Sequence, residues 1–373
     1  MQKHIVRILI PMLLVFLIPS HPAHAEAQAY CVCALYGGTV AEEQADAQLG
    51  VAGLSKLPAV LTLCRAFDRE LIAEDAQISV GKSASAIGGP TAFLKSGEVI
   101  EAQELIRAAV MISAGDAIYA LMEHAFGSED VFLQNIALTL RSLGIERDMT
   151  DCLGANERFS CRELLKLGEA AAQSPTFLKY CTVKYAVLKH ADGRDTELAS
   201  ANKLLTTLSG CFGLFTGSSK TDGYCGVFAC KRGEAVFLCA IVGAENSAAR
   251  FQTASKLFEE AFANYRTYRL CEADVPLLES YPVANGDATE IDLYTRQDVS
   301  LLLKKSDGEP QPYYDLPDPL IAPLDPEHAV GSVQFCAGDG TVLYESALYP
   351  KEAVASMGFC DILRRILLAY TAG

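Results

Sequence analysis

Apolar residues follow regular spacings along most of the chain, and these spacings predict strands and helices in a definite order. Residues 29–34 and 39–43 are short apolar-rich runs joined across Gly37 and Gly38, which predicts a β-hairpin. Apolar residues then recur at spacings of three and four, as on one face of a helix. This pattern predicts a long helical region, with helices at 57–72, 102–111, 117–125, 131–143 and 162–172.

Strand patterns return after the helical region. Ser128, followed by two acids, is expected to cap the helix at 131–143. Residues 223–230 and 235–243 are β-rich runs joined by a turn at 231–234, and 248–265 is an amphipathic helix. Strands at both ends with helices between them predict an α+β fold, in which one antiparallel sheet is flanked by helices and carries a helical insertion.

The composition changes near Cys271. From there to about residue 350 the chain has many prolines and short alternating runs such as 290–294 and 332–336, which predicts a small β-rich domain. Residues 358–373 form a short amphipathic tail, with Ile362 and Leu363 on one side and Arg364 and Arg365 on the other. Such a tail can lie on a membrane surface, but packing on its own domain is favoured for so few turns. The predicted domains are therefore 26–270 and 271–357.

The first residues read as a secretory signal. Lys3 and Arg7 precede an apolar run at 8–18, and Ala23-His24-Ala25 fits a small-residue cleavage site. A retained membrane anchor is the alternative, but the run is short for a span of about 20 residues. We expect residues 1–25 to be removed and the protein to be secreted or extracytoplasmic, in the cell envelope.

The charge balance disfavours a nucleic-acid partner. The formal net charge is -15, and removing Lys3 and Arg7 with the signal (-15 - 2) leaves -17. The sequence has no basic stripe, whereas phosphate binding needs clustered lysines and arginines.

Thirteen cysteines are many for an exported chain. Disulfides in an oxidising compartment would leave at least one unpaired thiol. However, Cys225, Cys230 and Cys239 fall inside apolar runs, which favours buried free thiols. Cys31 and Cys33 share one face of a predicted strand and could bind metal or pair elsewhere, but no CxxC and no nearby histidine cluster supports a metal. The sequence predicts neither a metal nor a cofactor.

Three short motifs occur in an order typical of one family. The chain reads A-G-L-S-K at 52–56, S-A-G-D-A at 113–117 and G-L-F-T-G at 213–217. It thereby resembles the serine-type D-alanyl-D-alanine carboxypeptidases, the low-molecular-weight penicillin-binding proteins, whose motifs read A-S-L-T-K, S-G-N-D-A and G-x-K-T-G. The flanking sequences agree as well: Gly127-Ser128, Leu143-Gly144, 202–205, 223–225, 249–251, Ala322-Pro323 and Val330-Gly331. The resemblance covers nearly all of the mature chain and implies the family's transpeptidase-like fold followed by a β-domain.

The sequence departs from the family pattern at the positions of catalytic and substrate-binding residues. Gly53 stands where the resemblance implies the nucleophilic serine, so no acyl-enzyme can form there. Gly115 replaces the asparagine that would hold the substrate carbonyl, and Phe215 replaces the lysine that would pair with substrate charge. The base position keeps Lys56 and the proton-shuttle position keeps Ser113. Thr216 and Gly217 complete the third motif unchanged.

Other residues could take over the missing roles, but simpler roles are favoured for each. Ser55 is expected to point away from the Gly53 face and to be the N-cap of a helix with Pro58 at its third position. Lys220 is expected to face away from Phe215 and to be solvated. Ser113 near Lys56 is a possible relic dyad, although a turn or packing role for Ser113 is preferred. His124 and His190 stand alone without a paired acid in a motif.

Two functions follow from this reading. The favoured hypothesis is a catalytically inactive envelope protein that binds peptidoglycan stem peptides or scaffolds a partner. The alternative is an active carboxypeptidase with an atypical site built on Ser113 or Ser55. Gly53→Ser alone is not expected to restore activity, because Pro58 shifts the helix start and Phe215 blocks the carboxylate site. Changing Gly53, Gly115 and Phe215 together to the family residues has a better chance, since these groups act as a unit.

Overall fold

The structure is a computed structural model that describes residues 27–35, 37–273 and 275–358. The predicted signal at 1–25 and residues 359–373 of the predicted tail lie outside this part of the chain. Within it, no helix combines the length and the apolar character needed to cross a bilayer.

A five-stranded sheet with the order β2-β1-β11-β10-β9 organises the first unit. The predicted hairpin is confirmed as β1 (Ala29–Ala34) and β2 (Thr39–Glu43), which pair antiparallel. The sheet is completed by β9 (Cys211–Ser219), β10 (Gly223–Arg232) and β11 (Ala235–Ala244). The last two strands run further than predicted, so the turn between them shrinks to residues 233–234.

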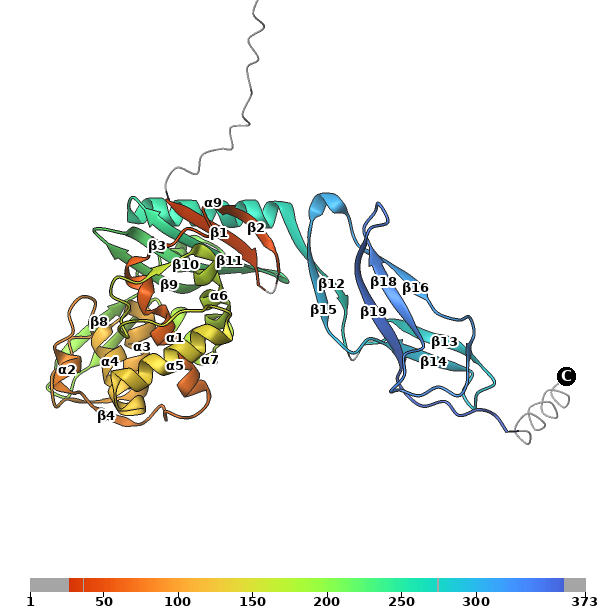
Figure 1. Ribbon diagram of the computed structural model, residues 1–373, viewed down its shortest axis with the longest axis horizontal. Helices are drawn as coiled ribbons and strands as arrows, with labels where there is room; N and C mark the ends of the chain where they lie inside the picture. The colour runs from red at the N-terminus through yellow and green to blue at the C-terminus, as the bar shows by residue number, and fades with distance from the viewer. Residues whose placement is uncertain (1–26, 36, 274, 359–373) are drawn as a thin grey trace, which may run out of the picture.

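The two faces of this sheet belong to different cores, because successive side chains in a strand point to opposite faces. Cys31, Cys33 and Leu238 face the helical region, whereas Val32 and Cys239 face α9 (Ser247–Asn264). Figure 1 shows α9 above the sheet and α1 to α7 below it. The α+β prediction is confirmed.

The helical region matches the predicted periodicity closely. Ser128 caps its helix as expected by accepting a hydrogen bond from the Val131 N–H. Short elements that the pattern did not predict accompany the helices: α2 (Lys82–Ser85), α8 (Leu204–Thr207), the two-stranded sheets β3/β6 (Leu49–Gly50, Arg158–Phe159) and β4/β5 (Gln77–Ser79, Val99–Glu101), and the hairpin β7/β8 (Tyr185–Lys189, Asp195–Ala199). The predicted helices are α1 (Leu57–Asp68), α3 (Ala102–Ile112), α4 (Gly115–Phe126), α5 (Glu129–Ser142) and α6 (Cys161–Ala171), and the shorter α7 (Pro175–Cys181) was not predicted.

A β-rich unit follows α9 without a break (Figure 1). β12 (Tyr265–Cys271) pairs with β15 (Val299–Lys304) directly after the helix. The remaining strands form one six-stranded sheet with the order β16-β18-β19-β14-β13-β17. Their bounds are β13 (Leu278–Ala284), β14 (Glu290–Tyr294), β16 (Gln311–Asp315), β17 (Leu320–Ile321), β18 (Gly331–Cys336) and β19 (Val342–Pro350). Two small apolar clusters hold this unit together, separately from the cores of the first unit.

Candidate functional site

The first and third motifs meet through their glycines. The first motif forms a short 3-10 helix, η1 (Ala52–Lys56), which runs directly into α1. A Cβ added to Gly217 on β9 would lie 2.5 Å from the backbone nitrogen of Gly53, so Gly217 must lack a side chain. A Cβ added to Gly53 would lie 3.2 Å from the Cα of Gly217, and a small shift of the backbone would be enough to relieve this close contact. The nucleophile position is thus a close backbone contact with no reacting atom.

Lys56 is committed to a structural hydrogen bond. A 3-10 helix has three residues per turn, so Lys56 lies on the same side of η1 as Gly53. Its side chain is almost completely buried, with 9 % of the residue exposed, and Nζ donates to the carbonyl oxygen of Ser113 at 3.0 Å. Burial lowers the pKa of Lys56, while Asp116 and Cys152 act in the opposite direction. A Ser113–Lys56 dyad would need Nζ of Lys56 to contact the Ser113 hydroxyl. In the structure Nζ contacts the Ser113 carbonyl oxygen instead.

The second motif forms a turn that a buried carboxylate holds in place. Ser113 ends α3 in the left-handed region, at φ 56°, and α4 begins at Gly115. Asp116 is 2 % exposed and accepts hydrogen bonds from the N–H groups of Ala92 at 2.9 Å and Leu94 at 3.1 Å. The aspartate of the motif therefore ties the loop at 88–98 to the start of α4.

Gly115 is surrounded so closely that the structure has no room for a side chain at this position. A Cβ at this position would lie 2.8 Å from Cγ2 of Ile87 and 3.3 Å from Nζ of Lys56. The first distance is shorter than real Cβ contacts, so any larger residue requires Ile87 to move. The asparagine of the family motif would need still more room than the Cβ alone.

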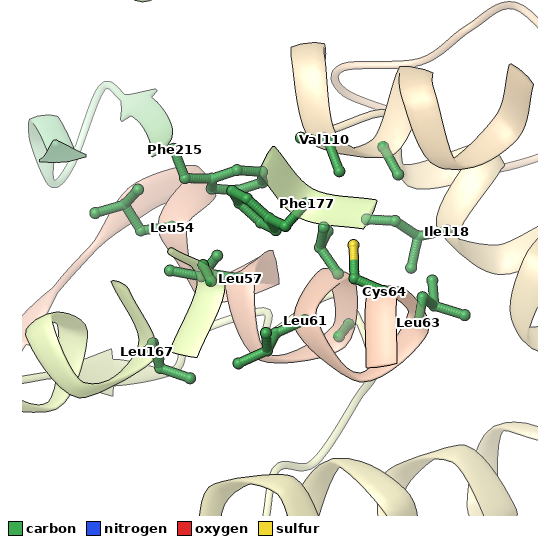
Figure 2. Packing of buried hydrophobic residues seen from close by; sticks show 14 of the residues in the cluster. Leu54, Leu57, Leu61, Leu63, Cys64, Val110, Ile118, Leu167, Phe177 and Phe215 are labelled. Carbon is green, nitrogen blue, oxygen red and sulfur yellow. The ribbon is translucent and has the colours of Figure 1, made fainter. Parts of the chain in front are cut away.

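Phe215 belongs to the hydrophobic core. Only 2 % of the residue is exposed, and its ring centroid lies 6.3 Å from that of Phe177 on α7. Figure 2 shows the two rings together above α1, with Leu54 beside Phe215. Thr216 and Gly217, which follow on β9, are partly exposed. The side chain that replaces the family's lysine is therefore packed in the core and places no charge in the site.

Sequence reasoning missed Arg250 as a member of this site. Its guanidinium is buried behind β9, with 3 % of the residue exposed, and Nη1 donates to the carbonyls of Gly217 at 3.0 Å and Cys225 at 2.8 Å. Its Nε has no hydrogen-bond partner, and no ion pair to Arg250 occurs among the described residues. Burial lowers the pKa of Arg250 to about 10. The signal in the sequence was an arginine in the first turn of an otherwise apolar helix face.

The N-cap expectation for Ser55 is wrong. The N-cap of α1 is Lys56, and Pro58 is the second residue of that helix rather than the third. Ser55 lies inside η1, where its hydroxyl donates to the carbonyl oxygen of Leu153 at 3.1 Å. Lys220 is exposed in the turn after β9 ends at Ser219.

Ser55→Ala is expected to lower the free energy of unfolding by about 1 kcal/mol, because the half-buried carbonyl of Leu153 loses its donor. Urea denaturation of both proteins would measure the difference. Ser55→Thr is the matched control, because threonine retains the hydroxyl that donates to Leu153. Equal stability of Ser55→Ala and the wild type would contradict this role.

His190 is not isolated, contrary to expectation. Its Nδ1 lies 2.7 Å from Oε1 of Glu98, and its Nε2 lies 2.8 Å from Oγ1 of Thr196. The contacts are buried and fasten the hairpin β7/β8 to the loop at 88–98. Sequence spacing could not reveal this acid, because it lies 92 residues away. His124 is exposed in the last turn of α4.

Two family descriptions match the chain in tandem. Residues 18–246 match "D-alanyl-D-alanine carboxypeptidase", and residues 265–356 match "Penicillin-binding protein 5, C-terminal domain". The first match ends just before α9, and the second covers the β-rich unit.

Individual relatives extend this similarity over nearly the whole chain. The D-alanyl-D-alanine carboxypeptidase DacF of Bacillus subtilis is 23% identical over 358 residues, covering 94% of this chain and 92% of that protein. DacC of Escherichia coli is 25% identical over 338 residues, covering 87% and 82%. Among solved structures, penicillin-binding protein 5 of Haemophilus influenzae superposes with a TM-score of 0.73 at 22% identity, covering 89% of this chain and 98% of that one. The structural similarity shows that the fold is shared.

Proposed function

This chain belongs to the D-alanyl-D-alanine carboxypeptidase family, and we propose that it is a catalytically inactive member that binds peptidoglycan stem peptides or scaffolds a partner in the cell envelope. The observation that carries the proposal is the contact between Gly53 and Gly217, where the reacting serine of the family is missing. No hydroxyl at this position means that no acyl-enzyme can form.

The remaining polar residues support inactivity rather than a relocated mechanism. Ser55 donates to the Leu153 carbonyl, and Lys56 donates to the Ser113 carbonyl. A general base must reach the proton that it removes, and Lys56 is directed at a carbonyl oxygen instead. The active-enzyme alternative would therefore need both side chains to leave buried hydrogen bonds.

The proposed peptide-binding role rests on the partly exposed edge strand β9. β9 is the edge strand of its sheet, and its residues Thr216 and Gly217 are partly exposed. An extended peptide can add to such an edge through main-chain hydrogen bonds. Arg250 places a positive charge behind Gly217, without a carboxylate among the described residues to neutralise it. This charge would favour a ligand that ends in a carboxylate.

The proposal includes export and the domain division. Residues 1–25 would be a cleaved signal, 26–270 the carboxypeptidase-like domain, 271–357 the β-rich domain and 358–373 an amphipathic tail able to touch a membrane surface. The relatives named D-alanyl-D-alanine carboxypeptidase support an extracytoplasmic location, since that activity concerns the cell wall.

The proposed function can be tested with the peptide diacetyl-L-lysyl-D-alanyl-D-alanine and the purified chain without residues 1–25. We expect saturable binding with a Kd in the micromolar to millimolar range, measured by calorimetry or ligand-observed NMR, and no released D-alanine. Arg250→Met should weaken binding about tenfold or more, because it removes the buried charge next to β9.

Lys220→Met is the matched control, since it removes the same charge from an exposed turn and should leave Kd unchanged. Circular dichroism would verify that both variants are folded. Absence of saturable binding at millimolar peptide would contradict the binding role, and release of D-alanine would favour the active-enzyme alternative.

A further inference from the structure

We infer that Cys211 and Cys230 form an oxidisable pair, a modification site at which a disulfide can link β9 to β10. The two residues are direct partners in the antiparallel register of these strands, immediately beyond a register shift between Ala229 and Cys230. Among all register pairs of the described strands, this is the pair in which both residues are cysteines. Both thiols are free in the structure.

The backbone geometry at this pair suits a disulfide. The Lys231 N–H donates to the Gly210 carbonyl at 2.9 Å, so the neighbouring pair of Cys211 and Cys230 is a non-hydrogen-bonded one. The Cys211 N–H agrees with this, because it donates to Leu208 at 3.2 Å and not across the ladder. In such pairs the Cα atoms lie about 4.5 Å apart, and disulfides span about 4.4–6.8 Å between Cα atoms.

The side chains of the pair also lie on the same face. Cys230 is a member of the apolar cluster beneath α9, and Cys211 packs against that cluster. The proximity of Cys211 contributes to the raised pKa of Cys230, after the larger effect of burial. Both thiols are therefore placed where a bond between them needs side-chain rotation and little movement of the backbone.

The other cysteines lack such a partner within the sheet. Cys31 lies opposite Ala240 and Cys33 opposite Leu238, while Cys225 lies opposite Gly217. The competing thiol is Cys181 on α7, whose Sγ donates to the Phe212 carbonyl at 3.4 Å, next to Cys211. Cys181, however, belongs to the cluster on the opposite face of the sheet.

The reaction requires a disulfide donor, either a small molecule such as glutathione disulfide or a protein disulfide. Cys211 is partly exposed, so its thiolate attacks one sulfur of the donor and releases the first thiolate. The thiolate of Cys230 then attacks the sulfur of Cys211 and releases the second. Two electrons pass from the two cysteines to the donor, and the two protons that they lose are taken up by the two released thiolates.

Burial should make this reaction slow at neutral pH. It raises the pKa of Cys211 to about 11 and that of Cys230 to about 12. Below those values the thiolate fraction rises about tenfold per pH unit, and only the thiolate attacks. The rate of bond formation should accordingly rise by up to about 100-fold between about pH 7 and about pH 9.

The bond would close a loop of about 20 residues and anchor the start of β9, the strand that carries Phe215, Thr216 and Gly217. Loop closure of this size restricts the unfolded chain, and we expect the Tm to rise by roughly 5 °C or more. The oxidised protein would therefore hold the third motif more firmly against η1.

The test treats the purified wild-type protein with excess glutathione disulfide at about pH 9, blocks residual thiols, and maps cross-linked peptides by mass spectrometry under non-reducing conditions. We expect one major cross-link, between Cys211 and Cys230, together with the higher Tm. Cys211→Ser and Cys230→Ala should each lose the cross-link and the Tm increase. Cys225→Ala, a change on the same strand, should keep both.

Three outcomes would overturn the inference: a major cross-link of Cys211 to Cys181, only glutathione adducts on Cys211, or full alkylation of Cys211 and Cys230 after the treatment. The mapping needs no variant to fold and no ligand to bind, so its result is independent of the proposed function.

Discussion

Wild-type protein incubated with excess fluorescent penicillin is expected to remain unlabelled, and to release no D-alanine from D-alanyl-D-alanine peptides. Gly53 offers no hydroxyl for acylation, and the loss of a serine nucleophile alone lowers turnover by a factor on the order of 10⁶. Gel fluorescence and intact-mass spectrometry would measure labelling, with Bacillus subtilis DacF as the positive control. Stoichiometric acylation mapped to any serine would contradict the proposed inactivity.

Gly53→Ser should also remain unlabelled, but for a different reason from the one that the sequence suggested. Pro58 does not shift the helix start, because η1 and α1 are continuous and Pro58 lies in the first turn of α1. The obstacles are the hydrogen bond that holds Lys56 on Ser113 and the ring of Phe215 in the core. A new hydroxyl at position 53 would therefore have no free base.

The second large effect is expected from Phe215→Lys, the substitution that restores the family residue. It should lower the free energy of unfolding by about 4 kcal/mol or more, because a buried aromatic ring is lost and an ammonium group takes its place beside Phe177 and Leu54. Chemical denaturation would measure the loss. Phe215→Leu is the control, and should cost only about 1 kcal/mol since it keeps an apolar side chain there.

The instability of Phe215→Lys should depend on pH. Burial would lower the pKa of the introduced lysine below its value in the unfolded chain. The penalty is then greatest below the folded-state pKa and shrinks as the pH rises towards about 10.4, the value for an unfolded lysine. Phe215→Leu should show no such difference from the wild type. A Phe215→Lys protein as stable as the wild type at neutral pH would contradict the core role of Phe215.

These effects revise the outlook for the triple change of Gly53, Gly115 and Phe215. Beyond the buried lysine, the asparagine at position 115 would meet Ile87, whose Cγ2 already lies 2.8 Å from the position of a Cβ. Restoring the three motif residues therefore requires at least a smaller residue at 87 and a repacked Phe177. The packing around the three motif positions therefore differs from what the family residues would need, in addition to the loss of the catalytic groups.

The sequence by itself determined the local structure and the family. Hydrophobic periodicity placed α1, α3, α4, α5 and α6 within a few residues of their true bounds, because each presents one apolar face to a large core. It also placed the first hairpin and the cap at Ser128. The three motifs, read in order, indicated both the family and the positions at which this chain departs from it.

Other features were decided by tertiary structure alone. Ser55 followed a capping pattern, but the carbonyl of Leu153, 98 residues away, provides its partner. The acid that pairs with His190 is Glu98, 92 residues away in the sequence, and not the nearby Asp192. Arg250 and Phe215 became site residues because Arg250 on α9 reaches the Gly217 carbonyl and Phe215 packs against Phe177 on α7. Sequence spacing reports the periodicity of one element at a time, whereas these contacts depend on how separate elements pack.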